Sequence, residues 1–144
     1  MSKILVIYDS LTGNTAKMAE LIAEGAKTVR EVHVEVCSVD AVNVKELNEA
    51  EAVAIGCPTH AFSASNKIKE FLSRNDVKEA LMSKDVAIFT SCLLYPSALK
   101  WFEKNLRMLN VRIVGKAYAR GKPKGNKVQE LLSLGRLLAD KIKR

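Results

Sequence analysis

The stretch KILVIYDSLTGNT, residues 3–15, decides the fold of this chain. Its first half, residues 3–8, is an almost continuous run of Ile, Leu and Val, typical of a strand buried on both faces of a parallel sheet. Its second half is polar, contains one glycine and leads to apolar residues at helical spacing from Met18 to Ala26. The stretch therefore predicts a central strand, a tight loop and a helix from Asn14 to Val29.

The rest of the chain repeats this alternation of strand and helix. Apolar runs at residues 52–57, closed by Pro58, and 86–90 predict two more buried strands, residues 111–118 predict another, and the alternating residues 32–36 predict an edge strand. Helices are predicted around residues 68–74, over 98–108 and over 128–143. Five strands separated by helices imply right-handed crossovers, and so a doubly wound α/β sheet.

Length and composition narrow the class of protein. A chain of 144 residues with 48% hydrophobic and 27% charged residues is expected to form one globular domain, residues 1–144, and not a disordered or fibrous one. No apolar run is long enough for a bilayer, and no signal-peptide pattern precedes the first strand. Cys37, Cys57 and Cys92 form neither an even disulfide set nor a metal-binding spacing. We expect a cytoplasmic protein without a metal centre.

The net charge of +7 lies entirely at one end of the chain. Residues 1–114 hold as many basic as acidic residues, whereas residues 115–144 hold nine basic residues against Glu130 and Asp140. This asymmetry is compatible with a docking surface for an acidic partner and equally with a solvated basic helix and loop.

The loop after the first strand carries the clearest chemistry. Ser10, Thr12 and Thr15 supply hydroxyl groups, Gly13 permits a tight turn, and the following helix presents the positive end of its dipole. In a doubly wound sheet, ligands bind beyond the carboxyl ends of the strands, where this loop lies. A single helix cap by Thr12 or Asn14 is the alternative, but it would explain only one of these side chains. The pattern favours a phosphate site without a cation.

Other nucleotide-binding motifs are absent from the sequence. No G-x-G-x-x-G follows the first strand, and no G-x-x-x-x-G-K-[ST] occurs. A phosphoacceptor receiver domain would need an acidic cluster at the carboxyl edge, where only Asp9 is available.

The segment from Ile7 to Thr15 resembles the N-terminal signature of flavodoxins, with the core S/T-x-T-G-x-T intact. The segments IGCPT at 55–59, VG at 114–115 and RGKP at 120–123 are similar to later segments of that family, and the length resembles its short-chain type. The resemblance implies a flavodoxin-like three-layer sandwich with a five-stranded parallel sheet in the order 2-1-3-4-5 and helices on both faces. It also implies FMN as the cofactor.

By this resemblance, three loops would hold FMN. The residues expected at the 5′-phosphate are Ser10, Leu11, Thr12, Gly13, Asn14 and Thr15. The residues expected beside the isoalloxazine ring are Pro58, Thr59, His60, Ala61 and Phe62 in the second loop, and Ser91, Cys92 and Tyr95 in the third.

Both ring loops depart from the family pattern. Residues 60–62 lack the usual glycine, and the third loop places Cys92 where a stacking tyrosine is expected, with Tyr95 three residues later. Each residue also has a purely structural interpretation: His60 facing solvent, Phe62 packing beneath its own loop, Tyr95 anchoring a helix start, and Cys92 as an inert buried thiol.

The resemblance implies an electron carrier that shuttles electrons between protein partners and has no catalytic residues of its own. The alternatives are a small FMN-dependent quinone or protoporphyrinogen oxidoreductase, and a binding module that has lost FMN. We expect a monomer whose redox partners have acidic docking surfaces, because the basic residues after the last strand, Arg120, Lys122, Lys124 and Lys127, follow it at the flavin edge. Membrane binding is not expected, and nucleic acid is disfavoured because aromatic residues do not interleave the basic ones.

Overall fold

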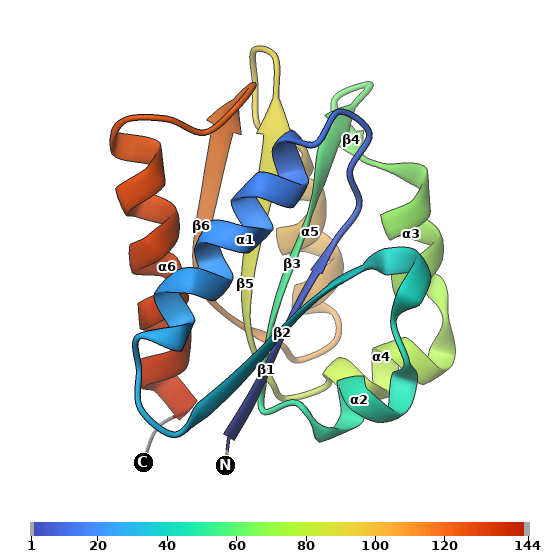
Figure 1. The fold of residues 1–144 in the computed structure, drawn as a ribbon. Helices are drawn as coiled ribbons and strands as arrows, with labels where there is room; N and C mark the ends of the chain where they lie inside the picture. Colours follow the sequence, from blue (N-terminus) through green and yellow to red (C-terminus); the bar gives the residue numbers. More distant parts are fainter. Residues whose placement is uncertain (1, 143–144) are drawn as a thin grey trace.

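A computed structural model of the chain describes residues 2–142. Its centre is a parallel sheet of five strands in the order β2-β1-β3-β5-β6, with a short β4 paired to β3 (Figure 1). The strands are β1 (Ser2–Tyr8), β2 (Val32–Ser38), β3 (Ala52–His60), β4 (Ser63–Ala64), β5 (Asp85–Cys92) and β6 (Arg112–Arg120). The predicted order 2-1-3-4-5 numbers only the parallel strands. It is confirmed, because it becomes β2-β1-β3-β5-β6 once the short antiparallel β4 is included in the numbering.

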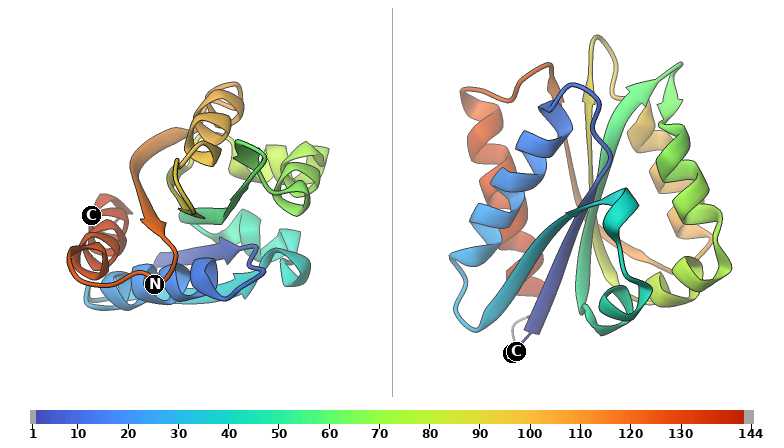
Figure 2. Two further views of the ribbon diagram at one scale, coloured as in Figure 1. Left: turned by 90° about the horizontal axis from the view of Figure 1, so that it is seen from above. Right: turned by 45° about the vertical axis from the view of Figure 1, so that its right-hand side comes forward.

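Two layers of helices enclose the sheet. Helices α1 (Asn14–Lys27) and α6 (Asn126–Ile142) cover one face, and α2 (Val44–Glu49), α3 (Asn66–Ser73), α4 (Asn75–Leu81) and α5 (Ala98–Arg107) cover the other (Figure 2). Successive residues of a strand point to opposite faces. Ile4 and Val6 therefore pack under α1 and α6, while Leu5 and Ile7 pack against the other layer.

The predicted strands are buried as their apolar runs require. Residues 4–7 of β1, 52–57 of β3 and all of β5 are buried, and these three strands occupy the middle of the sheet. Burial of a Leu, Ile or Val side chain stabilises a fold by about 1.5–3 kcal/mol. The long apolar strands thus fix the centre of the sheet, and with it the edge where the loops meet.

Some predicted boundaries are wrong. Pro58 does not close β3, which runs on to His60 and folds back on β4. Proline has no N–H to donate to a neighbouring strand. It is tolerated at residue 58 because the pairing of β1 with β3 ends at Gly56. Helix α1 ends at Lys27 rather than Val29, and the predicted end of the last helix at Lys143 lies outside the described residues.

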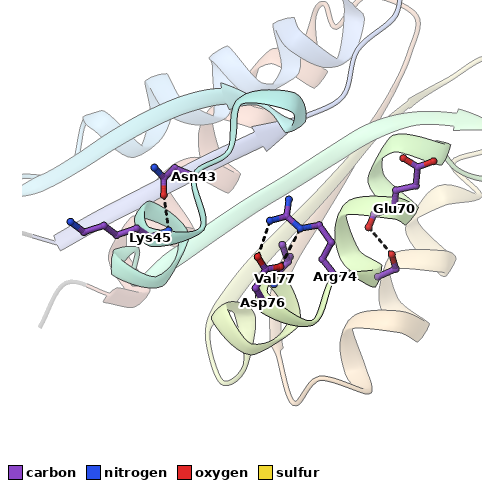
Figure 3. Close-up of polar contacts among 7 residues, drawn as sticks. Asn43, Lys45, Glu70, Arg74, Asp76 and Val77 are labelled. Carbon is purple, nitrogen blue, oxygen red and sulfur yellow. Dashed lines mark hydrogen bonds and ion pairs between the residues drawn. The ribbon is translucent and has the colours of Figure 1, made fainter.

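Short helices α2 and α4 are additions to the prediction. Asn43 begins α2 by accepting a hydrogen bond from the Lys45 N–H at 2.8 Å (Figure 3). At the α3–α4 corner, the Arg74 guanidinium pairs with the Asp76 carboxylate at 2.8 Å. Both helices lie at the end of the sheet opposite the carboxyl edge of the strands (Figure 1). Among the described residues, no helix is long and apolar enough to cross a membrane.

Candidate functional site

The carboxyl edge of the sheet gathers four loops, all at the top of Figure 1. These are the loop between β1 and α1 (the first loop, residues 9–13), the β3–β4 hairpin (the second loop, 60–63), the loop between β5 and α5 (the third loop, 93–97), and the loop between β6 and α6 (the closing loop, 121–125). Neighbouring parallel strands end at the same edge, so loops far apart in sequence come together here.

The first loop folds around the hydroxyl of Ser10. The Ser10 Oγ accepts hydrogen bonds from the backbone N–H of Gly13 at 3.1 Å and of Ala16 at 3.3 Å. Gly13 has φ of 92°, a left-handed conformation that glycine adopts without the steric cost of a side chain. It precedes α1 directly, so the turn and the helix start are one unit.

The start of α1 leaves backbone donors for a ligand. The first N–H groups of an α-helix have no intrahelical acceptor. Within residues 2–142, the N–H groups of Thr12, Asn14 and Thr15 find no protein acceptor; Gly13 at the N-cap position has no side chain, and Ser10 satisfies only the Ala16 N–H of the first turn. The structure therefore rejects the interpretation that Thr12 or Asn14 serves only as a cap. These donors and the helix dipole suit an anion.

Thr15, in the first turn of α1, links the start of this helix to the end of β5. Its side chain is buried, and its Oγ1 lies 2.7 Å from the Oγ of Ser91, which is also buried. Either hydroxyl can donate; when Ser91 donates, Thr15 keeps its own proton for a ligand. The pair fixes two predicted site residues to each other across 76 positions of sequence.

The second loop is a tight hairpin with an unusual sequence. Ala61 (φ 49°) and Phe62 (φ 63°) form its two-residue turn, and both lie in the left-handed region although neither is glycine, asparagine or aspartate. Two positive φ values are typical of a type I′ turn, which follows the twist of the two strands. The glycine expected by the family pattern is missing, yet the chain still turns with positive φ. Each such residue costs about 1–3 kcal/mol.

Thr59 connects the second loop to its neighbours. Its Oγ1 lies 2.9 Å from the Oγ1 of Thr90 and accepts a hydrogen bond from the N–H of Ala98 at 3.3 Å. It therefore joins β3 to β5 and to the start of α5, and it holds the second loop beside the third.

A hollow of about 220 Å³ lies between the second and third loops. Its lining residues are Thr59, Ala61, Phe62, Leu93, Leu94 and Tyr95. Phe62 is 79% exposed, so the interpretation that it packs beneath its own loop is wrong. Tyr95 is 64% exposed at the wall of this hollow. The lining of this hollow is mostly apolar.

Cys92 lies beneath the third loop and not in the lining of this hollow. It is buried, and its Sγ lies 3.8 Å from the Ala119 carbonyl oxygen as a weak donor. Burial raises the pKa of the Cys92 thiol, although Arg120 and Lys127 act in the opposite direction. The predicted burial of the Cys92 thiol is confirmed. Of Cys92 and Tyr95, only Tyr95 faces the hollow.

The closing loop clamps the third loop from the side. The Arg120 Nε donates to the Leu94 carbonyl oxygen at 2.9 Å, and the Gly121 N–H donates to the Cys92 carbonyl oxygen at 3.1 Å. The Arg120 guanidinium and the Lys127 ammonium also lie 5.4 Å and 3.7 Å from the ring centre of Tyr118. Arg120 and Lys127 are thus partly engaged by the fold, whereas Lys122 and Lys124 are exposed.

Sequence reasoning missed three features of this edge. Leu93, Leu94 and the contact of Arg120 with Leu94 were not predicted, and the run of two leucines in a loop is the one sequence signal for the first two. A second hollow of about 280 Å³ lies between α3, α4 and α5, with Trp101 in its wall. Among residues 2–142, no cluster of His, Cys, Asp and Glu could hold a metal.

Comparisons with known proteins agree with this geometry. A sequence profile described as a flavodoxin domain matches residues 5–129. The flavodoxin of Maridesulfovibrio salexigens is 31% identical over 99% of this chain and 100% of its own length. That of Aquifex aeolicus is 45% identical over 49% of this chain, an alignment that covers only 38% of the relative. A solved flavodoxin structure from the domain Archaea superposes with a TM-score of 0.88 and 30% identity over 99% of both chains.

Proposed function

Because this chain belongs to the flavodoxin family, whose cofactor is a flavin, we propose that it binds FMN at the carboxyl edge and carries electrons between redox proteins. The single observation that carries the proposal is the first loop, where backbone donors without a protein acceptor meet the start of α1. When bound, FMN would supply the redox chemistry through its isoalloxazine ring.

The residues of the first loop would hold the phosphate. The N–H groups of Thr12, Asn14 and Thr15 would donate to its oxygens, and the hydroxyls of Thr12 and Thr15 add two more donors. Ser10 acts one step further away, because its Oγ already accepts from Gly13 and Ala16 and so shapes the loop. Leu11, 71% exposed, would shield one side of the site from water.

The second and third loops would hold the ring. Pro58 and Thr59 lead into the hairpin, where Ala61 and Phe62 line the hollow and His60 is exposed beside them. Tyr95, in the third loop, would offer a flat side chain for stacking. Ser91 supports Thr15, and Cys92 supports the third loop from below. No side chain has to accept or donate a proton to a substrate.

Binding of FMN and of riboflavin by the apoprotein tests this proposal. The two ligands share the ring and the ribityl chain and differ in the phosphate, so their affinity ratio isolates the first loop. Several hydrogen bonds to a charged group, each contributing about 1.5–3 kcal/mol, predict that FMN binds more than about 100-fold tighter. Equal affinities, or a protein that cannot be loaded with FMN, would overturn the proposal and favour a binding module that has lost the flavin.

The openness of the ring hollow favours a second candidate, a small FMN-dependent oxidoreductase of the quinone or protoporphyrinogen type. Leu93 and Leu94 are exposed beside the hollow and could contact an apolar substrate that approaches the ring. Steady-state turnover of a quinone with NADH or NADPH by the FMN-loaded protein would favour this candidate. If the protein is an electron carrier, NADH or NADPH alone should give no such turnover, because a carrier receives its electrons from a reductant protein.

We further propose a cytoplasmic monomer whose partners are acidic redox proteins. All three cysteines are free thiols, as is usual in reducing compartments. Sedimentation of the purified protein and fractionation of cells test these two parts of the proposal.

A further inference from the structure

The structure sorts the basic residues that give the chain its net charge. Lys116 pairs with Glu103 at 3.1 Å, Lys127 pairs with Glu130 at 3.3 Å, and Arg120 donates to the Leu94 carbonyl oxygen. Lys122 and Lys124 are exposed and form no ion pair with any residue between 2 and 142. Arg136 and Lys141 also form no ion pair among these residues, but they lie on α6, whereas Lys122 and Lys124 lie on the closing loop.

The closing loop lies against the ring hollow. Its first residue, Gly121, is hydrogen-bonded to Cys92, and Arg120 before it is hydrogen-bonded to Leu94, which lines the hollow. Figure 1 shows the closing loop and the third loop side by side at the top of the sheet. Lys122 and Lys124 belong to the same closing loop as Gly121 and so to the edge that carries the hollow.

The four loops that form this part of the edge carry no exposed acidic side chain. The four loops, residues 9–13, 60–63, 93–97 and 121–125, contain one acidic residue, Asp9, which is 6% exposed. Approaching molecules consequently meet a positive surface. A second copy of this chain would bring like charges together, which disfavours self-association through this face.

Apolar side chains adjoin the basic loop. Leu93 is 88% exposed, Leu94 68% and Leu11 71%, and all three belong to loops of the same edge. Large apolar side chains beside exposed charges are typical of a protein interface, which has an apolar centre and a charged rim. A free ion or small acid would not need this apolar part.

We propose that this edge docks an acidic electron-transfer protein, with Lys122 and Lys124 attracting it and the exposed leucines contacting it next to the ring. The inference rests on the proposed function, since it presumes a flavin in the hollow. Arg120 and Lys127 act differently, because they position the third loop and Tyr118. Attraction by exposed charges raises the association rate and weakens as salt screens it.

Stopped-flow electron transfer to the FMN-loaded protein tests the inference. The probe is a reduced plant-type [2Fe–2S] ferredoxin, an acidic carrier. Each ferredoxin cluster loses one electron and the flavin gains it, so two ferredoxins and two protons from water complete the reduction. The test variant is Lys122→Gln/Lys124→Gln, and the matched control is Lys45→Gln/Lys141→Gln, two exposed lysines at the opposite end of the sheet.

For charges on the order of 10 Å from an acidic partner, the test variant should react about five- to tenfold more slowly at 10 mM ionic strength. At 1 M the difference should fall below about twofold, because the screening length is then about 3 Å. The control should match the unmodified protein within about twofold at both salt concentrations. Mitochondrial cytochrome c, a basic carrier that oxidises the reduced protein, should show the opposite dependence on salt.

Three results would overturn the inference. They are an unchanged rate for the test variant at low salt, an equal loss in the control variant, and a dimer that buries the two lysines. In each case the protein still shows flavin absorbance, so the proposed function would stand. A chain that cannot take up FMN would overturn both proposals.

Discussion

The contact between α1 and α6 depends on two glycines, and replacing either one should destabilise the protein. A Cβ at residue 135 would lie 1.9 Å from the Ile22 carbonyl oxygen, and one at residue 25 would lie 1.9 Å from the Leu132 carbonyl oxygen. Both obstacles are backbone atoms of a packed helix, which cannot rotate away as a side chain does. Ordinary contact begins at 3.4 Å, so the helices would have to separate by about 1.5 Å.

Two opposing contributions set the magnitude for Gly135→Ala. Overpacking costs about 1–3 kcal/mol, and a backbone obstacle puts this site near 3 kcal/mol. Alanine recovers about 1 kcal/mol of helix propensity relative to glycine. The net loss in the free energy of unfolding is therefore about 2 kcal/mol, and Gly25→Ala should lose a similar amount. One separation of the helices makes room for both Cβ atoms, so the double variant should lose about 3 rather than about 4 kcal/mol.

Urea titrations followed by circular dichroism measure all three variants. Gln129→Ala is the control, because Gln129 is exposed on the same helix and its replacement should change the free energy of unfolding by less than about 0.5 kcal/mol. Unchanged or increased stability in Gly135→Ala, or strictly additive losses in the double variant, would refute the reasoning.

Other predictions follow from single contacts. Ala61→Gly should relieve the left-handed strain of the hairpin and raise the free energy of unfolding by about 1 kcal/mol; a decrease in a urea titration would contradict it. Ser91→Ala leaves the buried Thr15 hydroxyl without its partner and should cost about 1–3 kcal/mol and weaken FMN binding severalfold; wild-type values in both measurements would count against the link. Burial raises the pKa of Cys57 from 9.0 to about 11, so this thiol favours the folded state fully below pH 9, and the contribution is lost as pH rises to 11. Between pH 9 and 11, the free energy of unfolding of Cys57→Ala should therefore fall by about 2–3 kcal/mol less than that of the unmodified protein. The same pH dependence in both proteins would contradict this role of Cys57.

The sequence predicted what depends on local patterns. Unbroken apolar runs identified the buried strands, and the hydroxyl-rich loop before α1 identified the candidate phosphate site. The hairpin at 60–63 escaped prediction because neither Ala61 nor Phe62 is a turn residue, and tertiary pairing of β3 with β4 imposes the positive φ values. The short helices α2 and α4, of six and seven residues, are too brief to give a periodic signal.

Contacts across long stretches of sequence were also beyond prediction. The Thr15–Ser91 pair spans 76 positions and the Arg120–Leu94 contact spans 26. Strand order alone brings these residues together, and no local pattern records it. The choice between Cys92 and Tyr95 depended on the same information, since the end of β5 at Cys92 determines which side chain is buried and which reaches the hollow.

The departures from ordinary folding rules concentrate at one edge. Nine large apolar side chains are exposed among the described residues, and five of them, Leu11, Phe62, Leu93, Leu94 and Tyr95, belong to the loops at the carboxyl edge. Two of the five non-glycine residues with positive φ lie in the hairpin of the same edge, and its closing loop carries Lys122 and Lys124, which form no ion pair among residues 2–142. If folding alone determined the surface, we would expect exposed apolar side chains to be spread over it. The concentration of exposed apolar side chains where the unpaired N–H donors of α1 also lie argues that this edge is shaped by a ligand.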